Sequence, residues 1–362
     1  MKLPENFTPR IVTKITATLL LGAVGGAVAD YLTLPMPWLV GALLITLAPA
    51  LSGAPLQNPK RLRFYAASAL GVMLGSGFTP EIFKQAAQWP ISLTAILIYT
   101  VVVGGLVVFC LNKLTKLGFV NSFFGASPGG LVEMVLLARE YGGDEKRVSL
   151  MHSTRLMLTV LIIPIFYRLY YGYTPAARAA GLESHGDIGL YDAAVLISCG
   201  VIGYWGAKKL NVPAYQIFGP LFLSAFVHIT GITSAHIPNS LIIIAQVIFG
   251  TALGCSFLGI SLRNVADTLA TSVAMTLTYL TLAAASAYGL GHLTGLPFKT
   301  LFLIFSPGGL PEMTLISLSL NIDIAFVTTH HAVRVVFLLF IVPVIFYWIA
   351  PRYGISTHKK QG

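Results

Sequence analysis

Charged side chains within apolar sequence are the residues of this chain best suited to chemistry. Arg155 and Arg334 each follow a helix-capping aspartate by eleven positions, which places them about 16 Å along a helix. A guanidinium in such surroundings is costly and by default functional, and we expect it to bind a ligand. The alternative is a structural clamp, in which each arginine pairs with Glu133 or Glu312.

Histidines accompany both arginines. His152 lies three residues before Arg155, and His331 lies three residues before Arg334, so each pair shares one helix face. A histidine can carry a coupling proton near neutral pH, although a hydrogen-bonded buried histidine explains the pattern equally well. His330 lies four residues before Arg334.

A Ser-Pro-Gly-Gly motif precedes each of these sets. Ser127–Gly130 and Ser306–Gly309 interrupt apolar segments, and proline with two glycines breaks a helix there. We expect Ser127 to cap a short helix that starts at Pro128 and runs about 14 residues. The start of such a half-helix presents free N–H groups and attracts anions. A tight packing turn is the alternative. Glu133 and Glu312, six residues past each serine, could bind Na⁺ or a proton.

The motif and its neighbours are repeated at one fixed offset. Ser306 follows Ser127 by 179 positions, and the same spacing relates several rarer residues. The chain is therefore a tandem duplication with a junction near 172–188. The matched pairs are Gly71 with Gly250, Gly75 with Gly254, Asp144 with Asp323, His152 with His331, Arg155 with Arg334, and Pro164 with Pro343.

Composition places the chain in a membrane. It is 10% charged and 56% hydrophobic over 362 residues, whereas soluble domains are roughly 25% charged. The net charge of +10 comes from short basic clusters between apolar runs. Such clusters are typical of topology signals and not of a nucleic-acid surface. The three cysteines show neither a disulfide framework nor a zinc-site spacing.

Each half contains six apolar segments, of which the fifth holds the break. The first resembles a signal peptide, but its counterpart in the second half indicates a retained helix. Pro37 and Pro213 are expected to open equivalent helices, and the Gly-x-x-x-Gly pairs mark packing faces. The segments are 13–32, 37–52, 63–79, 90–112, 119–141 and 147–171, then 188–207, 213–232, 239–258, 268–292, 298–320 and 324–350.

The distribution of Lys and Arg predicts how the halves are related. If the broken segments enter and return on one side, the halves are inverted, with 17 basic residues inside and three outside. If they cross, the halves are parallel, with 13 inside and seven outside. Positive residues face the cytoplasm. We therefore predict inverted repeats of five crossings each (13–171 and 188–350), cytoplasmic termini and an external loop at 172–187.

These residues resemble a known family. Two copies of Ser-Pro-Gly-Gly-x-x-x-Met with a downstream arginine and a later proline, spanning about residues 15–350, resemble the AbrB-type duplicated bacterial membrane proteins. Members of that family carry labels of a transporter, an ammonia monooxygenase and a regulator of gene expression. The resemblance implies a multi-pass protein of the bacterial inner membrane, which shares only a name with the DNA-binding AbrB regulators. The matching residues are Ser127, Pro128, Gly129, Gly130, Met134, Arg155, Ser306, Pro307, Gly308, Gly309, Met313 and Arg334.

Inverted repeats with broken helices favour a secondary transporter of a small anionic solute by alternating access. A regulator is the alternative, although the short termini leave little room for an effector region. A metal-dependent oxidase is less favoured, since no metal motif appears. We expect no catalytic residue, cofactor, metal or nucleic-acid partner, and leave a homo-oligomer open. The expected substrate-binding residues are Ser127, Gly129, Gly130, Arg155, Ser306, Gly308, Gly309 and Arg334, and the expected coupling residues are Glu133, His152, Glu312 and His331.

Overall fold

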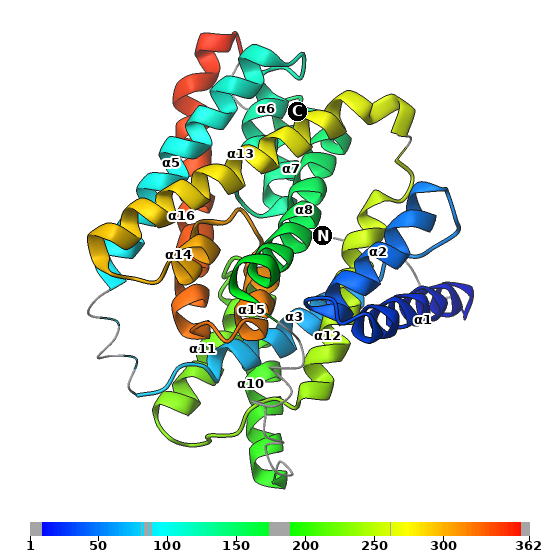
Figure 1. The fold of residues 1–362 in the computed structure, drawn as a ribbon, viewed down its shortest axis with the longest axis vertical. Coiled ribbons are helices and arrows are strands. Elements are labelled where there is room, and N and C mark those ends of the chain that lie inside the picture. Colours follow the sequence, from blue (N-terminus) through cyan, green and yellow to red (C-terminus); the bar gives the residue numbers. More distant parts are fainter. Residues whose placement is uncertain are drawn as a thin grey trace. The chain divides into compact units, whose positions relative to one another are not determined.

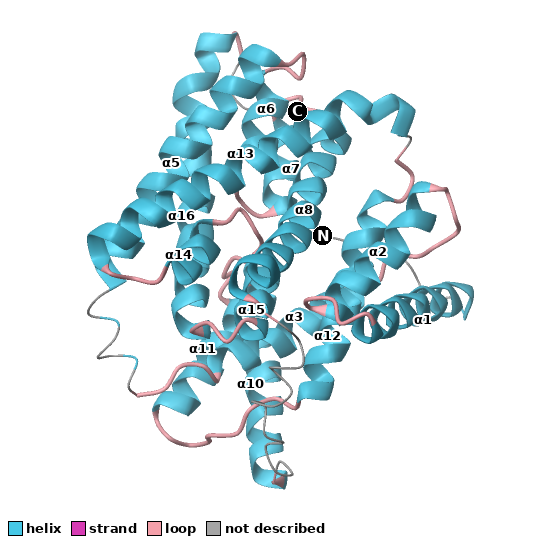
Figure 2. Cartoon of the chain, in the orientation of Figure 1, coloured by secondary structure: helices cyan, strands magenta, loops and turns pink. Residues whose placement is uncertain are grey.

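The structure is a computed structural model that describes residues 9–80, 82, 86, 89–173, 189–260 and 262–355. The regular structure of these residues is helical throughout (Figures 1 and 2). The all-α fold predicted from the sequence is confirmed. The longer helices are α1 (Pro9–Tyr31), α2 (Pro37–Leu51), α3 (Lys60–Gly75), α5 (Trp89–Leu114), α8 (Glu145–Tyr171), α10 (Leu190–Lys209), α11 (Tyr215–Ile229), α12 (Asn239–Gly254), α13 (Leu262–Thr294) and α16 (Ile324–Ile349).

Two apolar segments are broken into pairs of short helices, as predicted. The first gives α6 (Phe119–Ala126) and α7 (Leu131–Glu140), and the second gives α14 (Phe298–Phe305) and α15 (Leu310–Ser319). Short 3-10 turns follow α12 (η1, Cys255–Phe257) and α16 (η2, Ala350–Tyr353). Each half-helix is too short to cross a hydrocarbon core of about 30 Å.

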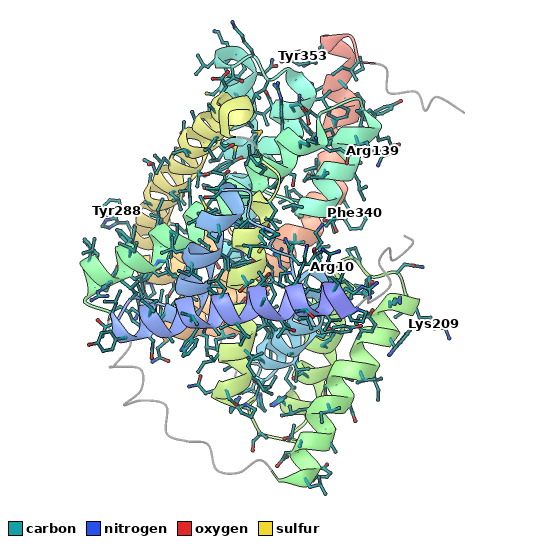
Figure 3. The ribbon with its side chains drawn as sticks, turned by 90° about the vertical axis from the view of Figure 1, so that its right-hand side faces the viewer. Arg10, Arg139, Lys209, Tyr288, Phe340 and Tyr353 are labelled. Atoms are coloured by element: carbon teal, nitrogen blue, oxygen red, sulfur yellow. The ribbon has the colours of Figure 1, made fainter. Side chains whose placement is uncertain are left out.

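Seven helices in the described part of the chain are long and apolar enough to cross a membrane. Their outer faces carry large apolar side chains, as a lipid-facing surface requires. Phe340 on α16 is 69% exposed and Tyr288 on α13 is 64% exposed (Figure 3). The chain is therefore a multi-pass membrane protein. Most of the predicted external loop, 172–187, lies outside the described residues, and the inverted relation of the halves stays a prediction.

The chain divides into two compact units, and each unit takes equivalent elements from both halves. Unit 1 comprises residues 1–85, 160–261 and 314–325, so it contains the first three helices of each half. Unit 2 comprises residues 86–159, 262–313 and 326–362, and it contains both breaks. The two repeats are thus interleaved, and neither half forms a compact body by itself.

Within unit 1 the helices of the two halves pair crosswise through glycines. Helix α3 packs on α11, and its counterpart α12 packs on α2. A Cβ at Gly71 would lie 2.5 Å from the carbonyl oxygen of Ile217, and one at Gly250 would overlap the carbonyl of Leu39. The Gly-x-x-x-Gly pairs are therefore close-packing faces, as the sequence predicted. Helix α2 begins at Pro37, but α11 begins at Tyr215, two residues after Pro213.

Glycines on α10 offer a matched test of this packing. A Cβ at Gly203 would lie 2.6 Å from the carbonyl carbon of Gly219 on α11, whereas Gly206 on the same helix has open space. We expect Gly203→Ala to lower the thermal midpoint of unfolding, since overpacking costs about 1–3 kcal/mol. Gly206→Ala should keep or slightly raise it, because alanine favours the helix. Equal midpoints for the two variants would show that α10 and α11 are not this closely packed.

Candidate functional site

The first break lies between α6 and α7 in unit 2. Ser127 follows the last residue of α6, and its Oγ donates to the carbonyl of Phe123 at 2.7 Å. It therefore ends α6, and the expectation that it caps the next helix is wrong. The N-cap of α7 is Gly130, in an extended conformation with φ −63° and ψ 135°. A serine hydroxyl can donate to a carbonyl of the preceding turn or accept from an N–H of the following turn. Here Ser127 bonds to the preceding turn.

The spacing of the motif follows from two side chains that fold back onto its glycines. The Cε of Met134 would lie 2.9 Å from a Cβ at Gly129, and a Cβ at Gly130 would overlap the Oε2 of Glu133. Glu133 is the third residue of α7, where a glutamate can reach back toward the N-cap. The negative carboxylate also suits the positive end of the helix. The two glycines thus make room for the methionine and the glutamate.

The second break, between α14 and α15, repeats this arrangement. It is drawn in orange in Figure 1. The Oγ of Ser306 donates to the carbonyl of Phe302 at 2.6 Å. A Cβ at Gly308 would overlap Met313, and one at Gly309 would overlap the Oε2 of Glu312. Glu312 is buried, whereas Glu133 is half-buried. The duplication therefore extends from the sequence to the local geometry.

Each buried arginine binds the carbonyl end of a half-helix. Arg155 donates from one terminal nitrogen to the carbonyls of Ala126 at 3.4 Å and Ser127 at 3.2 Å. Arg334 donates to Ser306 at 2.9 Å and Gly308 at 2.8 Å, with a longer contact of 3.4 Å to Ile304. The last carbonyls of a helix lack partners within it and form the negative end of its dipole. A guanidinium at this position donates hydrogen bonds to these carbonyls and places a positive charge at the negative end of the dipole.

The clamp is therefore built on backbone carbonyls. Neither guanidinium forms an ion pair with a carboxylate in the part of the chain that the structure describes. Arg155 is 3% exposed and Arg334 is 1% exposed. The Nε atom of each is buried and has no hydrogen-bond partner among the described residues. Each break thus contains a buried guanidinium whose Nε–H group makes no hydrogen bond within the described residues.

The histidines are held in one tautomer by these arginines. The terminal nitrogen of Arg155 donates to Nδ1 of His152 at 3.0 Å, and that of Arg334 donates to Nδ1 of His331 at 2.9 Å. Because Nδ1 accepts, Nε2 carries the proton. It donates to the carbonyl of Phe124 at 2.9 Å in the first copy and of Leu303 at 3.1 Å in the second. Both histidines are neutral and fully hydrogen-bonded here.

Two tyrosines that sequence reasoning missed connect the breaks within unit 2. Tyr279 on α13, from the second half, donates to the carbonyl of Ala126 at the first break, at 2.9 Å. Tyr99 on α5, from the first half, donates to the carbonyl of Tyr279 at 3.2 Å, and its ring lies 4.9 Å from that of Phe305. A buried tyrosine needs a hydrogen-bond partner for its hydroxyl. A tyrosine within an apolar segment was therefore the feature of the sequence that could have indicated these contacts.

Asp144 behaves as the sequence predicted. Its Oδ1 accepts from the backbone N–H groups of Lys146 at 2.9 Å and Arg147 at 3.2 Å, so it caps α8. Helix α16 likewise begins directly after Asp323. The caps set the starts of the helices that carry His152 and His331. The eleven-residue spacing then brings each arginine to its break.

This fold and site define a class: a multi-pass α-helical membrane protein with a duplicated broken helix, each break closed by a buried His–Arg pair. The model of the family described as "Transition state regulatory protein AbrB" matches residues 38–350. The chain belongs to that family, as the sequence predicted.

Two relatives extend over most of the chain. "Uncharacterized protein YhjN" of Bacillus subtilis (strain 168) is 26% identical over 362 residues, covering 94% of each chain. "Putative regulator AbrB" of Escherichia coli (strain K12) is 26% identical over 317 residues, covering 86% of this chain and 89% of the relative. The residues matched by the family model, 38–350, include both breaks and both arginines of this chain.

Proposed function

We propose that this protein is a secondary transporter of a small anionic solute, with its site at the two breaks of unit 2. The main support is that a buried guanidinium lies at each of the two matching breaks. Neither guanidinium forms an ion pair with a carboxylate in the described part of the chain. Buried charge in a membrane protein marks a functional site by default. Two such cations, linked through Tyr99 and Tyr279, favour an anion.

The start of each half-helix supports the same proposal. Glu133 and Glu312 hold their carboxylates over the N-cap glycines, where an anion would bind. An anionic group of the solute takes the position of such a carboxylate when it binds. Glu133 and Glu312 remain proposed coupling residues, whereas His152 and His331 are held by the arginines. Discontinuous helices at equivalent positions of two repeats are typical of secondary transporters.

A regulator is the second candidate function, because the relative from Escherichia coli is named a putative regulator. On this proposal, the breaks bind a small anion and the protein signals its presence. The two functions differ in one measurable respect, since a regulator need not move the solute across the membrane. An oxidase would in addition require a bound metal, which elemental analysis of the purified protein detects.

A thermal-shift screen of small anions tests the proposal. Carboxylates, phosphate and sulfate, compared with chloride at constant ionic strength, should include at least one that raises the thermal midpoint of the purified protein. Binding at a hundred times Kd stabilises by about 2.7 kcal/mol. The stabilising anion, radiolabelled, should then accumulate in proteoliposomes and not in empty liposomes. Binding without accumulation would favour the regulator, and no stabilising anion would contradict an anion site at the breaks.

A further inference from the structure

A buried serine–histidine pair lies beside the second break, in unit 2. The Oγ of Ser92 on α5 lies 2.8 Å from Nε2 of His330 on α16, and both side chains are fully buried. The Nδ1 of His330 lies 2.7 Å from the carbonyl of Phe326, and the Oγ of Ser92 lies 3.0 Å from the carbonyl of Trp89. The rings of Phe326 and Trp89 flank the imidazole, with centroids 4.1 Å and 6.1 Å away.

This network satisfies His330 in both of its protonation states. In the neutral ring, Nδ1–H donates to Phe326 and the hydroxyl of Ser92 donates to Nε2. In the imidazolium, Nδ1–H keeps its partner, Nε2–H donates to the oxygen of Ser92, and the hydroxyl turns to donate to Trp89. A hydroxyl hydrogen rotates freely. Only that rotation is needed, and no heavy atom has to move.

The other two buried histidines at the breaks, His152 and His331, lack this property. Protonation of His152 or His331 would put an N–H at Nδ1, which already receives an N–H of Arg155 or Arg334. Two donors would then face each other, and the guanidinium would have to leave. Among the three histidines at the breaks, His330 is the one whose surroundings accept a proton.

The repeat provides an internal comparison. The position equivalent to His330 in the first half is Met151, which cannot bind a proton and is fully buried. Both halves carry the His–Arg pair, so that pair forms part of the shared framework. The serine–histidine pair joins α5 of the first half to α16 of the second, and Met151 cannot form its counterpart. One proton site in two otherwise matched breaks gives the molecule an asymmetric response to pH.

We propose that His330 is a proton-binding residue at the second break, with Ser92 as its positioning residue. The proposal rests on the proposed function, for which it names the proton as the coupling ion. It replaces His152 and His331 in that role. Burial of a charge is costly, so uptake of the proton favours a conformation in which water reaches this site.

The second break is the element that such a proton would disturb. Arg334 lies one helical turn after His330, and His331 is the next residue on the same helix. From α5, the contacts with His330 are made by Trp89 and Ser92, which carry no charge. A positive charge at His330 repels the guanidinium of Arg334 and weakens its bonds to Ser306 and Gly308.

Nitrogen-15 NMR of histidine-labelled protein in detergent tests the proposal without any solute. One buried imidazole should take up a proton as the pH is lowered, so that both of its ring nitrogens give protonated signals at low pH. His330→Gln should remove this titration. His292→Gln, which replaces an exposed histidine of α13, should leave it in place. A titration that survives in His330→Gln, or an imidazole of His330 that stays neutral throughout, overturns the proposal.

Ser92 variants provide the second measurement, in case His330→Gln does not fold. Ser92→Ala removes the acceptor of the imidazolium, so the titration midpoint of His330 should move to lower pH by at least one unit. Ser92→Thr keeps the hydroxyl and should restore the wild-type midpoint. An unchanged midpoint in Ser92→Ala contradicts the proposed network. If His330 titrates as expected and no anion is taken up, the proton site stands and the transport function fails.

Discussion

Arg334→Ala should destabilise the folded protein strongly, and more strongly than Arg155→Ala. Hydrogen bonds to charged groups contribute about 1.5–3 kcal/mol each. Arg334 makes two short bonds to backbone carbonyls, at 2.9 and 2.8 Å, so we expect a loss of about 3–6 kcal/mol. The carbonyl bonds of Arg155 are longer, at 3.2 and 3.4 Å, and we expect about half that loss. Thermal unfolding in detergent, followed by circular dichroism, measures both.

Two further variants separate charge from geometry. Arg334→Lys keeps the charge but not the planar fork that reaches several carbonyls, so its stability should be intermediate. Arg139→Ala removes an exposed arginine and should leave the thermal midpoint unchanged, because its ion pair with Glu145 lies at the surface. If Arg334→Ala melts like wild type but no longer binds the anion, the arginine acts on the solute alone, as the sequence by itself suggested.

The sequence predicted the helices and their breaks well, for physical reasons that are local. Proline and paired glycines end a helix wherever they occur, so the breaks at Ser127–Gly130 and Ser306–Gly309 were readable from residue types. The aspartate caps and the Gly-x-x-x-Gly faces were readable for the same reason. The repeat added confirmation, because each feature occurs twice at one offset.

The contacts of the site could not be predicted, because they depend on tertiary packing. A buried arginine suggests a carboxylate partner, and nothing in the residue pattern indicates that Ser306 and Gly308 offer their carbonyls instead. Tyr99 and Tyr279 lie 180 positions apart, one more than the repeat offset, so they are not equivalent positions of the two halves. The interleaving of the two halves is also a tertiary property, since α3 pairs with α11 and α2 pairs with α12 of the other repeat.

Gly309→Ala should abolish binding and uptake of the solute with little loss of thermal stability. The backbone at the equivalent Gly130 is extended, with φ −63°, so alanine is accommodated without strain. The added methyl group, however, overlaps the carboxylate of Glu312, which is the flexible end of a side chain and can move aside. The methyl group then occupies the place where we propose the anion binds. Gly130→Ala should act in the same way through Glu133. Stabilisation by the anion and its uptake into proteoliposomes are the measurements.

A double-mutant comparison distinguishes the methyl group from the displaced carboxylate. Glu312→Ala alone removes the overlap and should leave the anion able to bind, since the positive end of the helix dipole remains in place. If Gly309→Ala still eliminates binding in the Glu312→Ala background, the methyl group itself blocks the anion. If binding returns in the double variant, the effect of Gly309→Ala runs through Glu312. Uptake that survives Gly309→Ala and Gly130→Ala together would make the motif a packing turn that holds Met313 and Met134, and the solute would have to bind away from the half-helix starts.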